Sequence, residues 1–232
     1  MDLGMPALIE LRSLEDCARL CRELGLQFVE WNMNLPQCQP ERMEAAVLRK
    51  IREQYGIYFT LHLDENLNPC DFNRRVAGAY IRTAEDAIAL AKELEMPILN
   101  MHLSKGVYFT LPDRKIFLFD QYRERYLSDL RTFRDRCEAA VGAADVKICV
   151  ENSDGFTDFQ LEALDLLLES PVFALTFDIG HNHSIGGTDE PPILERRTRL
   201  VHFHFHDAQG KKNHLPLGAG EIEIPKNLAL AK

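Results

Sequence analysis

The stretch FALTFDIGH, residues 173–181, joins a buried-strand pattern to polar groups at its carboxyl end. Residues 173–177 are almost entirely apolar, which is typical of a parallel strand covered on both faces. Asp178 follows at once, and His181 comes three residues later. Because functional groups of parallel α/β proteins gather where the strands end, this stretch predicts a parallel sheet with a site at its carboxyl edge.

The same arrangement recurs along the chain. Short β-like runs alternate with amphipathic helical segments, and this alternation predicts repeated βα units. Nearly every run carries Glu, Asp, Asn or His near its end. The predicted strands are residues 7–11, 28–33, 58–64, 97–103, 147–152, 173–181 and 200–207, and the predicted helices include 13–25, 73–95, 113–144 and 159–170.

Polar groups at the ends of many strands favour a closed barrel over a doubly wound sheet, in which function concentrates at one switch point. The first run also leads directly into RSLED, without a glycine-rich phosphate loop. We therefore predict an α/β fold of the (β/α)8 TIM-barrel type. The last segment, residues 225–232, reads as the seventh helix, so an eighth βα unit is lacking. No linker divides the chain, and a single domain over residues 1–232 is expected.

Composition narrows the functional classes. The 232 residues are 46% hydrophobic and carry a formal charge of -9, which repels nucleic acid. No segment is long and apolar enough to suggest a membrane span or a secretory leader, so we expect a cytoplasmic protein. Six cysteines without a C-x-x-C pair indicate reduced thiols.

Glu151, Asp178 and His204 are the strongest candidates for metal ligands, since each falls near the end of a successive strand. Mixed carboxylate and imidazole donors suit one divalent ion such as Mn, Mg, Co or Zn. His204 lies in LVHFHFHD, residues 200–207, where alternation puts three histidines on one face and two phenylalanines on the other. An ordinary hydrogen-bonded core role is the alternative for any one of these histidines.

The segments NMHLS, ICVENSDGF, TFDIGH, VHFHFHD and HLPLGAGEI together resemble the xylose-isomerase-like barrel superfamily. That superfamily comprises sugar and sugar-phosphate isomerases and epimerases, with the type IV apurinic endonucleases as a related branch. The resemblance implies that Glu151, Asp178 and His204 bind the metal and that Glu151 also exchanges the substrate proton. The family's last glutamate, on the eighth strand, has no counterpart here.

Further residues are expected at the substrate, some from the same resemblance and His206 from its place near the carboxyl end of its predicted strand. His181 matches a substrate-contacting histidine, and His206 is expected beside the substrate or the metal ligands. In the endonuclease branch, Asp stands where this chain has Lys212, which argues against a three-metal site. The expected substrate-binding residues are His62, His102, His181, His206 and His214.

These observations predict a metal-dependent sugar or sugar-phosphate isomerase or epimerase that moves a proton alpha to a carbonyl. A phosphodiester hydrolase like the apurinic endonucleases is one alternative, which the negative charge disfavours. A non-catalytic barrel that binds a sugar or a protein partner is the other. The resemblance is also compatible with a homo-oligomer.

Overall fold

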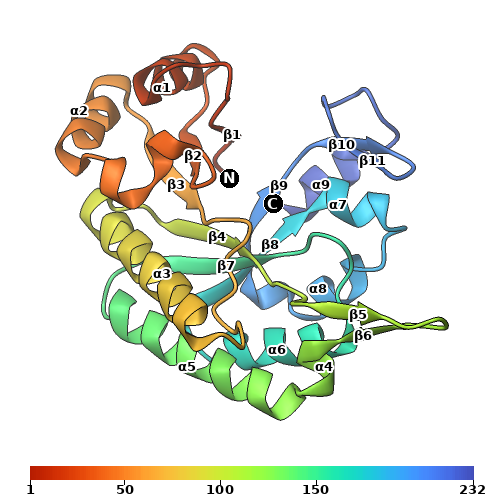
Figure 1. Ribbon diagram of the computed structural model, residues 1–232. Coiled ribbons are helices and arrows are strands. Elements are labelled where there is room, and N and C mark those ends of the chain that lie inside the picture. The colour runs from red at the N-terminus through yellow and green to blue at the C-terminus, as the bar shows by residue number, and fades with distance from the viewer. The chain divides into compact units, whose positions relative to one another are not determined.

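The computed structural model describes residues 1–232, which form two compact units. The first contains Met1–Met101 and Asp135–Ile148, and the second contains His102–Arg134 and Cys149–Lys232. Figure 1 follows the chain through both units from the N-terminus in red to the C-terminus in blue. The expectation of a single domain over residues 1–232 stays a prediction.

The first unit alternates strands with helices. Its strands follow the order β1-β2-β3-β4, and each strand pairs in parallel with the next. Glu30 lies opposite Thr60, whose hydroxyl donates a hydrogen bond of 3.1 Å to the Glu30 carboxylate. The elements are β1 (Gly4–Pro6), α1 (Leu14–Glu23), β2 (Phe28–Asn32), α2 (Ala45–Tyr55), β3 (Tyr58–His62), α3 (Arg74–Leu94) and β4 (Ile98–His102).

The second unit contains the strand order β7-β8-β9 and two antiparallel hairpins, β5-β6 and β10-β11. The β5-β6 hairpin projects away from its unit (Figure 1). The elements that lie partly or wholly here are β5 (Tyr108–Thr110), β6 (Lys115–Phe117), α4 (Leu118–Gln121), α5 (Arg123–Val141), β7 (Lys147–Glu151), α6 (Asp158–Leu168), β8 (Phe173–Asp178), α7 (Ile179–Ser184), α8 (Glu190–Glu195), β9 (Leu200–His204), β10 (Asp207–Gln209), β11 (Lys212–Leu215) and α9 (Ile224–Leu230).

Strand β8 supplies much of the apolar core beneath the carboxyl edge of the second unit. All six of its residues are buried. Phe177 packs with Ile179 and Ile193, and this cluster is covered by Phe203 of β9 and by Phe205 just beyond the end of that strand. The predicted apolar face of residues 200–207 is therefore confirmed, because both phenylalanines turn toward the core.

The structure corrects two sequence-based predictions and adds one helix. The first strand is Gly4–Pro6, and residues 7–11 form turns in which Ile9 is 79% exposed, so their apolar character does not reflect burial. Residues 113–144 contain β6, α4 and α5 in place of one helix. Helix α2 was not among the predicted segments, because only Leu48 and Ile51 mark its buried side.

The α/β class and six of the seven predicted strand positions are confirmed. The strand orders of the two units, β1-β2-β3-β4 and β7-β8-β9, contain seven strands in all, and an eighth βα unit is not among the elements of residues 1–232. No helix combines the length and the hydropathy needed to cross a bilayer.

Candidate metal and substrate site

Three polar side chains end three strands of the second unit. Glu151 is the last residue of β7, Asp178 the last of β8 and His204 the last of β9. Asp178 and His204 are direct register partners in the parallel pair. The side chains of Glu151 and Asp178 are only 1% and 3% exposed. Two carboxylates are thus held in a poorly solvated place, where an ionised group needs a compensating charge.

Glu151 lies between two imidazoles. Its Oε1 is 2.8 Å from His204 Nδ1, and its Oε2 is 3.3 Å from His102 Nε2. Asp178 Oδ2 is 3.8 Å from the same nitrogen of His204. One ligand atom from each of Glu151, Asp178 and His204 lies within 4.8 Å of the others. Two carboxylates and an imidazole at this spacing fit a divalent ion that accepts oxygen and nitrogen ligands.

Asp178 is held on both its backbone and its side chain. It is the N-cap of α7, where Oδ1 accepts a hydrogen bond of 2.7 Å from the backbone N–H of His181. The buried amide of Asn152 donates to the carbonyl oxygen of Asp178 at 3.0 Å and accepts from its N–H at 2.8 Å. These contacts orient the carboxylate before any ligand binds.

His206 also contacts Asp178, although it lies beyond the end of β9. Its Nε2 is 2.9 Å from Asp178 Oδ1 and 3.0 Å from Oδ2. Burial opposes protonation of this imidazole, but the hydrogen bond and the negative charge of Asp178 outweigh it, so the pKa of His206 is raised. The ring lies against Gly180, where a Cβ would come within 2.0 Å of the imidazole.

Asp207 anchors the loops that follow β9. Its carboxylate accepts hydrogen bonds from the backbone N–H groups of Ala208, Gly218, Gly220 and Ile222 at 2.8–3.1 Å. Burial raises the pKa of the Asp207 carboxyl, but these four donors outweigh burial and lower it overall. The carboxylate therefore ties the start of the β10-β11 hairpin to the loop after it.

A family model described as xylose isomerase-like TIM barrel matches residues 18–230. The chain belongs to this family. The resemblance predicted from the sequence motifs is thereby confirmed, as is the α/β fold of the TIM-barrel type with an incomplete set of βα units.

Individual relatives of this xylose isomerase-like chain are distant. An uncharacterized protein of Methanocaldococcus jannaschii is 28% identical over 191 residues, which are 76% of this chain and 61% of the archaeal protein. The crystal structure of a D-tagatose 3-epimerase-like protein superposes with a TM-score of 0.78 at 24% identity, covering 99% of this chain and 85% of that one. D-allulose 3-epimerase from Methylomonas sp. gives 0.72 at 14% identity, covering 99% and 79%. At such identities the structures establish a shared fold alone.

The predicted site residues of this xylose isomerase-like chain fall into three places. Glu151, Asp178, His204 and His102 lie together. The second place, next to Asp178, holds His181, His206 and His214. His62 belongs to the first unit, where it ends β3 and its Nδ1 is 2.8 Å from the carbonyl oxygen of Leu63. The catalytic, metal-binding and substrate-binding roles of all these residues stay predictions.

Three residues of the site were missed by sequence reasoning. Asn152 follows Glu151 in the quoted motif, but its contact with Asp178 crosses between strands. Gly180 lies inside TFDIGH, and its glycine could have indicated the close approach of another group, which in the structure is the imidazole of His206. Asn213 immediately precedes His214 and contacts His181 across the site. In each case the partner is distant in sequence, so local patterns do not reveal it.

Proposed function

We propose that this chain is a metal-dependent isomerase or epimerase of a small sugar or sugar phosphate, and that Glu151, Asp178 and His204 bind its divalent ion. The observation that carries the proposal is the pair of buried carboxylates beside one imidazole at the ends of β7, β8 and β9. Such carboxylates repel each other in a poorly solvated site unless a cation offsets their charge.

The donor set is compatible with Mn, Mg, Co or Zn. When bound, the ion supplies a Lewis acid that polarises the sugar carbonyl and the adjacent hydroxyl, and so acidifies the neighbouring C–H bond. Asp178 and His204 hold ligand atoms on one side of the site. Asn152 and the first turn of α7 keep the Asp178 carboxylate in place through its backbone and Oδ1.

Glu151 is the proposed base. Its carboxylate takes the proton from the carbon next to the carbonyl and returns it to the neighbouring carbon, which isomerises the sugar, whereas epimerisation needs a second acid that delivers a proton to the opposite face of the same carbon. His102 Nε2 lies 3.3 Å from Oε2, and His204 Nδ1 lies 2.8 Å from Oε1. Each imidazole contacts one oxygen of the base, and together they fix the orientation of the carboxylate in the site.

The sugar class of substrate rests on the names of structural neighbours. They include a D-tagatose 3-epimerase-like protein, D-allulose 3-epimerase from Methylomonas sp. in complex with D-allulose, and 3-keto-D-glucoside 4-epimerase from E. coli. A ketohexose is therefore the first substrate class to test. A negatively charged chain with Lys212 in place of an acidic residue is less suited to an abasic nucleic acid.

The test measures exchange of the substrate proton with solvent. Purified protein reconstituted with Mn²⁺, Co²⁺, Mg²⁺ or Zn²⁺ is incubated in D₂O with D-fructose, D-allulose, D-tagatose and their phosphates. Deuterium incorporation next to the carbonyl is read by NMR and mass spectrometry. We expect incorporation with one metal equivalent per chain, and a loss of about 10²-fold or more in Glu151→Gln.

Glu162→Gln is the matched control, because it is the same substitution at an exposed side chain of α6. Its exchange rate should equal that of the unaltered chain. Exchange that survives in folded Glu151→Gln would reject Glu151 as the base. No exchange with any sugar, together with about three zinc ions per chain and cleavage of abasic DNA, would favour the hydrolase. No metal in any preparation would favour a binding module.

A further inference from the structure

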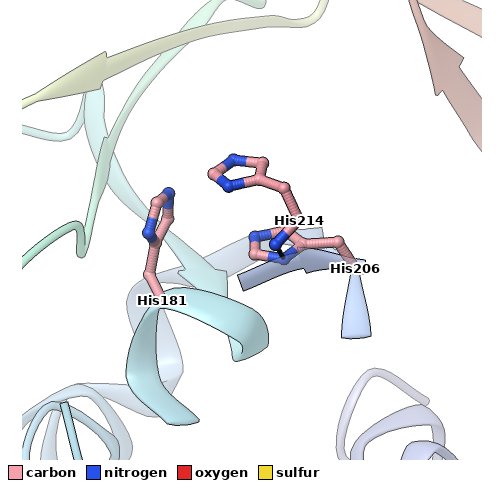
Figure 2. Close-up of side chains that lie close together, drawn as sticks. All are labelled: His181, His206 and His214. Atoms are coloured by element: carbon pink, nitrogen blue, oxygen red, sulfur yellow. Dashed lines mark hydrogen bonds between the residues drawn. The ribbon is translucent and has the colours of Figure 1, made fainter. Parts of the chain in front are cut away.

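Figure 2 shows a second group of imidazoles, those of His181, His206 and His214. The rings of His206 and His181 lie 2.9 Å and 3.9 Å from the carboxylate of Asp178. The rings of His206 and His214 are stacked, with centroids 4.2 Å apart and planes 6° from parallel. The ring of His181 stands edge-on to His214, at 5.0 Å and 78°. Nitrogens of all three rings lie within 4.8 Å of one another, so spacing alone is compatible with a metal ion.

The hydrogen bonds of His206 argue against that use. Its Nδ1 accepts a hydrogen bond of 2.8 Å from the backbone N–H of His214. The same Nδ1 lies 3.4 Å from the carbonyl oxygen of Asp207, and the shorter contact with the His214 N–H decides its role. A ring nitrogen that accepts a hydrogen bond carries no proton, so in the neutral ring Nε2 carries it and donates to Asp178 at 2.9 Å. Both nitrogens of His206 are therefore engaged. The ring stacks against that of His214, and its lone pair at Nδ1 is already used by the hydrogen bond from the backbone of His214.

Asn213 connects the other two imidazoles. One end of its amide, Nδ2, is 3.1 Å from His181 Nδ1, and the other end, Oδ1, is 2.9 Å from His214 Nδ1. The amide nitrogen only donates and the amide oxygen only accepts. One imidazole must therefore accept through Nδ1 while the other donates through Nδ1. Turning the amide over exchanges the two roles but keeps them opposite.

Opposite roles at Nδ1 require opposite tautomers. A neutral imidazole has a single N–H, so the ring that accepts at Nδ1 presents an N–H at Nε2, and the ring that donates at Nδ1 presents a lone pair there. Asp178 Oδ2 lies 3.9 Å from His181 Nε2 and favours the proton at that nitrogen.

His214 is also held in an unusual backbone conformation. Its φ of 56° lies in the left-handed region, which residues with a side chain rarely adopt. The residue is exposed, so burial of its side chain does not account for this conformation. Strained backbone of this kind concentrates at ligand sites. Here it permits the N–H of His214 to reach His206 while the imidazole stacks on the same ring.

We propose that Asn213 is a specificity-determining residue that locks His181 and His214 into opposite tautomers, so that their Nε2 atoms form a donor and acceptor pair for the hydroxyl groups of the substrate. A sugar hydroxyl both donates and accepts, and adjacent hydroxyls are matched by one N–H and one lone pair. An ion needs a lone pair from each ligand, and only one of these three rings has a lone pair that no hydrogen bond within the chain already uses. The hydroxyl-binding part rests on the proposed function, whereas the tautomers are a property of the chain alone.

The experiment measures the tautomers directly. Protein labelled with ¹⁵N-histidine is studied by two-bond ¹H–¹⁵N NMR at pH 7.5, with His181→Gln and His214→Gln used for assignment. We expect the proton on Nε2 in His181 and on Nδ1 in His214. In Asn213→Asp a carboxylate can only accept, so both rings should carry the proton on Nδ1. Identical tautomers for the two histidines in the unaltered chain would overturn the proposal.

Asn66→Asp is the matched control, since it makes the same charge change at an exposed position of the first unit. It should leave both tautomers unchanged. D-fructose or D-allulose, added with Mg²⁺, should shift the resonances of both histidines in the unaltered chain and not in Asn213→Asp. If neither sugar shifts them, hydroxyl binding is rejected. If opposite tautomers are found but deuterium exchange fails, the proposed reaction is rejected while the tautomer lock stands.

Discussion

The α-carbon of Gly180 lies so close to the imidazole of His206 that a Cβ there would come within 2.0 Å of Cε1 and 2.1 Å of Nδ1. These distances are far shorter than any van der Waals contact. The absence of a side chain at residue 180 therefore permits His206 to reach Asp178. A glycine in the first turn of α7 thus sets the position of a residue that lies beyond the next strand.

Gly180→Ala should displace His206 and remove its hydrogen bond to Asp178. Because groups that orient metal ligands typically contribute 10- to 100-fold in affinity, we expect the affinity for Mn²⁺ or Co²⁺ to fall by about that factor. Isothermal titration of metal-free protein measures it, with circular dichroism as the check on folding.

Gly78→Ala is the control for this substitution. Gly78 lies inside α3, and a Cβ there would meet only the end of the Arg82 side chain at 3.6 Å. The control should keep its metal affinity and gain about 0.5–1 kcal/mol of stability, because alanine favours a helix more than glycine does. A folded Gly180→Ala variant with unchanged metal affinity would contradict the role assigned to His206.

Asp207→Asn should destabilise the chain in a pH-dependent way. One carboxylate oxygen of Asp207 accepts hydrogen bonds from the backbone N–H groups of Gly218 and Gly220. The amide nitrogen of an asparagine in its place cannot accept them. The pKa of Asp207 is lowered in the folded chain, so the ionised carboxyl contributes stability above its ordinary pKa of 3.8. That contribution is lost as the pH falls through the lower folded value.

Thermal unfolding of both chains at several pH values between 7 and 3 provides the measurement. The melting temperature of Asp207→Asn should lie below that of the unaltered chain at pH 7, and the gap should narrow below about pH 4. Asp113→Asn, at an exposed aspartate of the β5-β6 turn, should show no such gap. A gap that stays constant with pH would mean that the carboxylate charge is not what the loop requires.

Phe177→Ala tests the packing beneath the site. Phe177 is fully buried against Ile179 and Ile193, with an edge-on contact to Phe203 at 6.2 Å. Loss of this ring leaves a cavity, so the free energy of unfolding should fall by about 3–5 kcal/mol. Urea titration measures the loss. Leu217→Ala, at a side chain that is 57% exposed, should change it by less than about 0.5 kcal/mol, and similar effects for both variants would contradict this account.

Much of the fold follows from local patterns in the sequence. Strands β2, β3, β4, β7, β8 and β9 were predicted from apolar runs, because such runs record burial directly. The first strand was misplaced because an apolar run there does not coincide with a buried strand. Residues 7–11 are mostly apolar but form turns in which Ile9 is exposed, while Gly4–Pro6 pairs with β2. A short edge strand carries too few residues for its periodicity to be read.

The sequence by itself also identified which residue types end the strands, and hence that Glu151, Asp178 and His204 would lie at one edge. Only the tertiary structure decided which atoms meet. Glu151 and His204 are 53 positions apart, and Asn213 and His181 are 32 apart. Periodicity places a side chain on a face of its own strand or helix, but a hydrogen bond between distant residues depends on register, loop path and close packing. These are properties of the folded chain, and they set the tautomers and orientations on which the proposed chemistry depends.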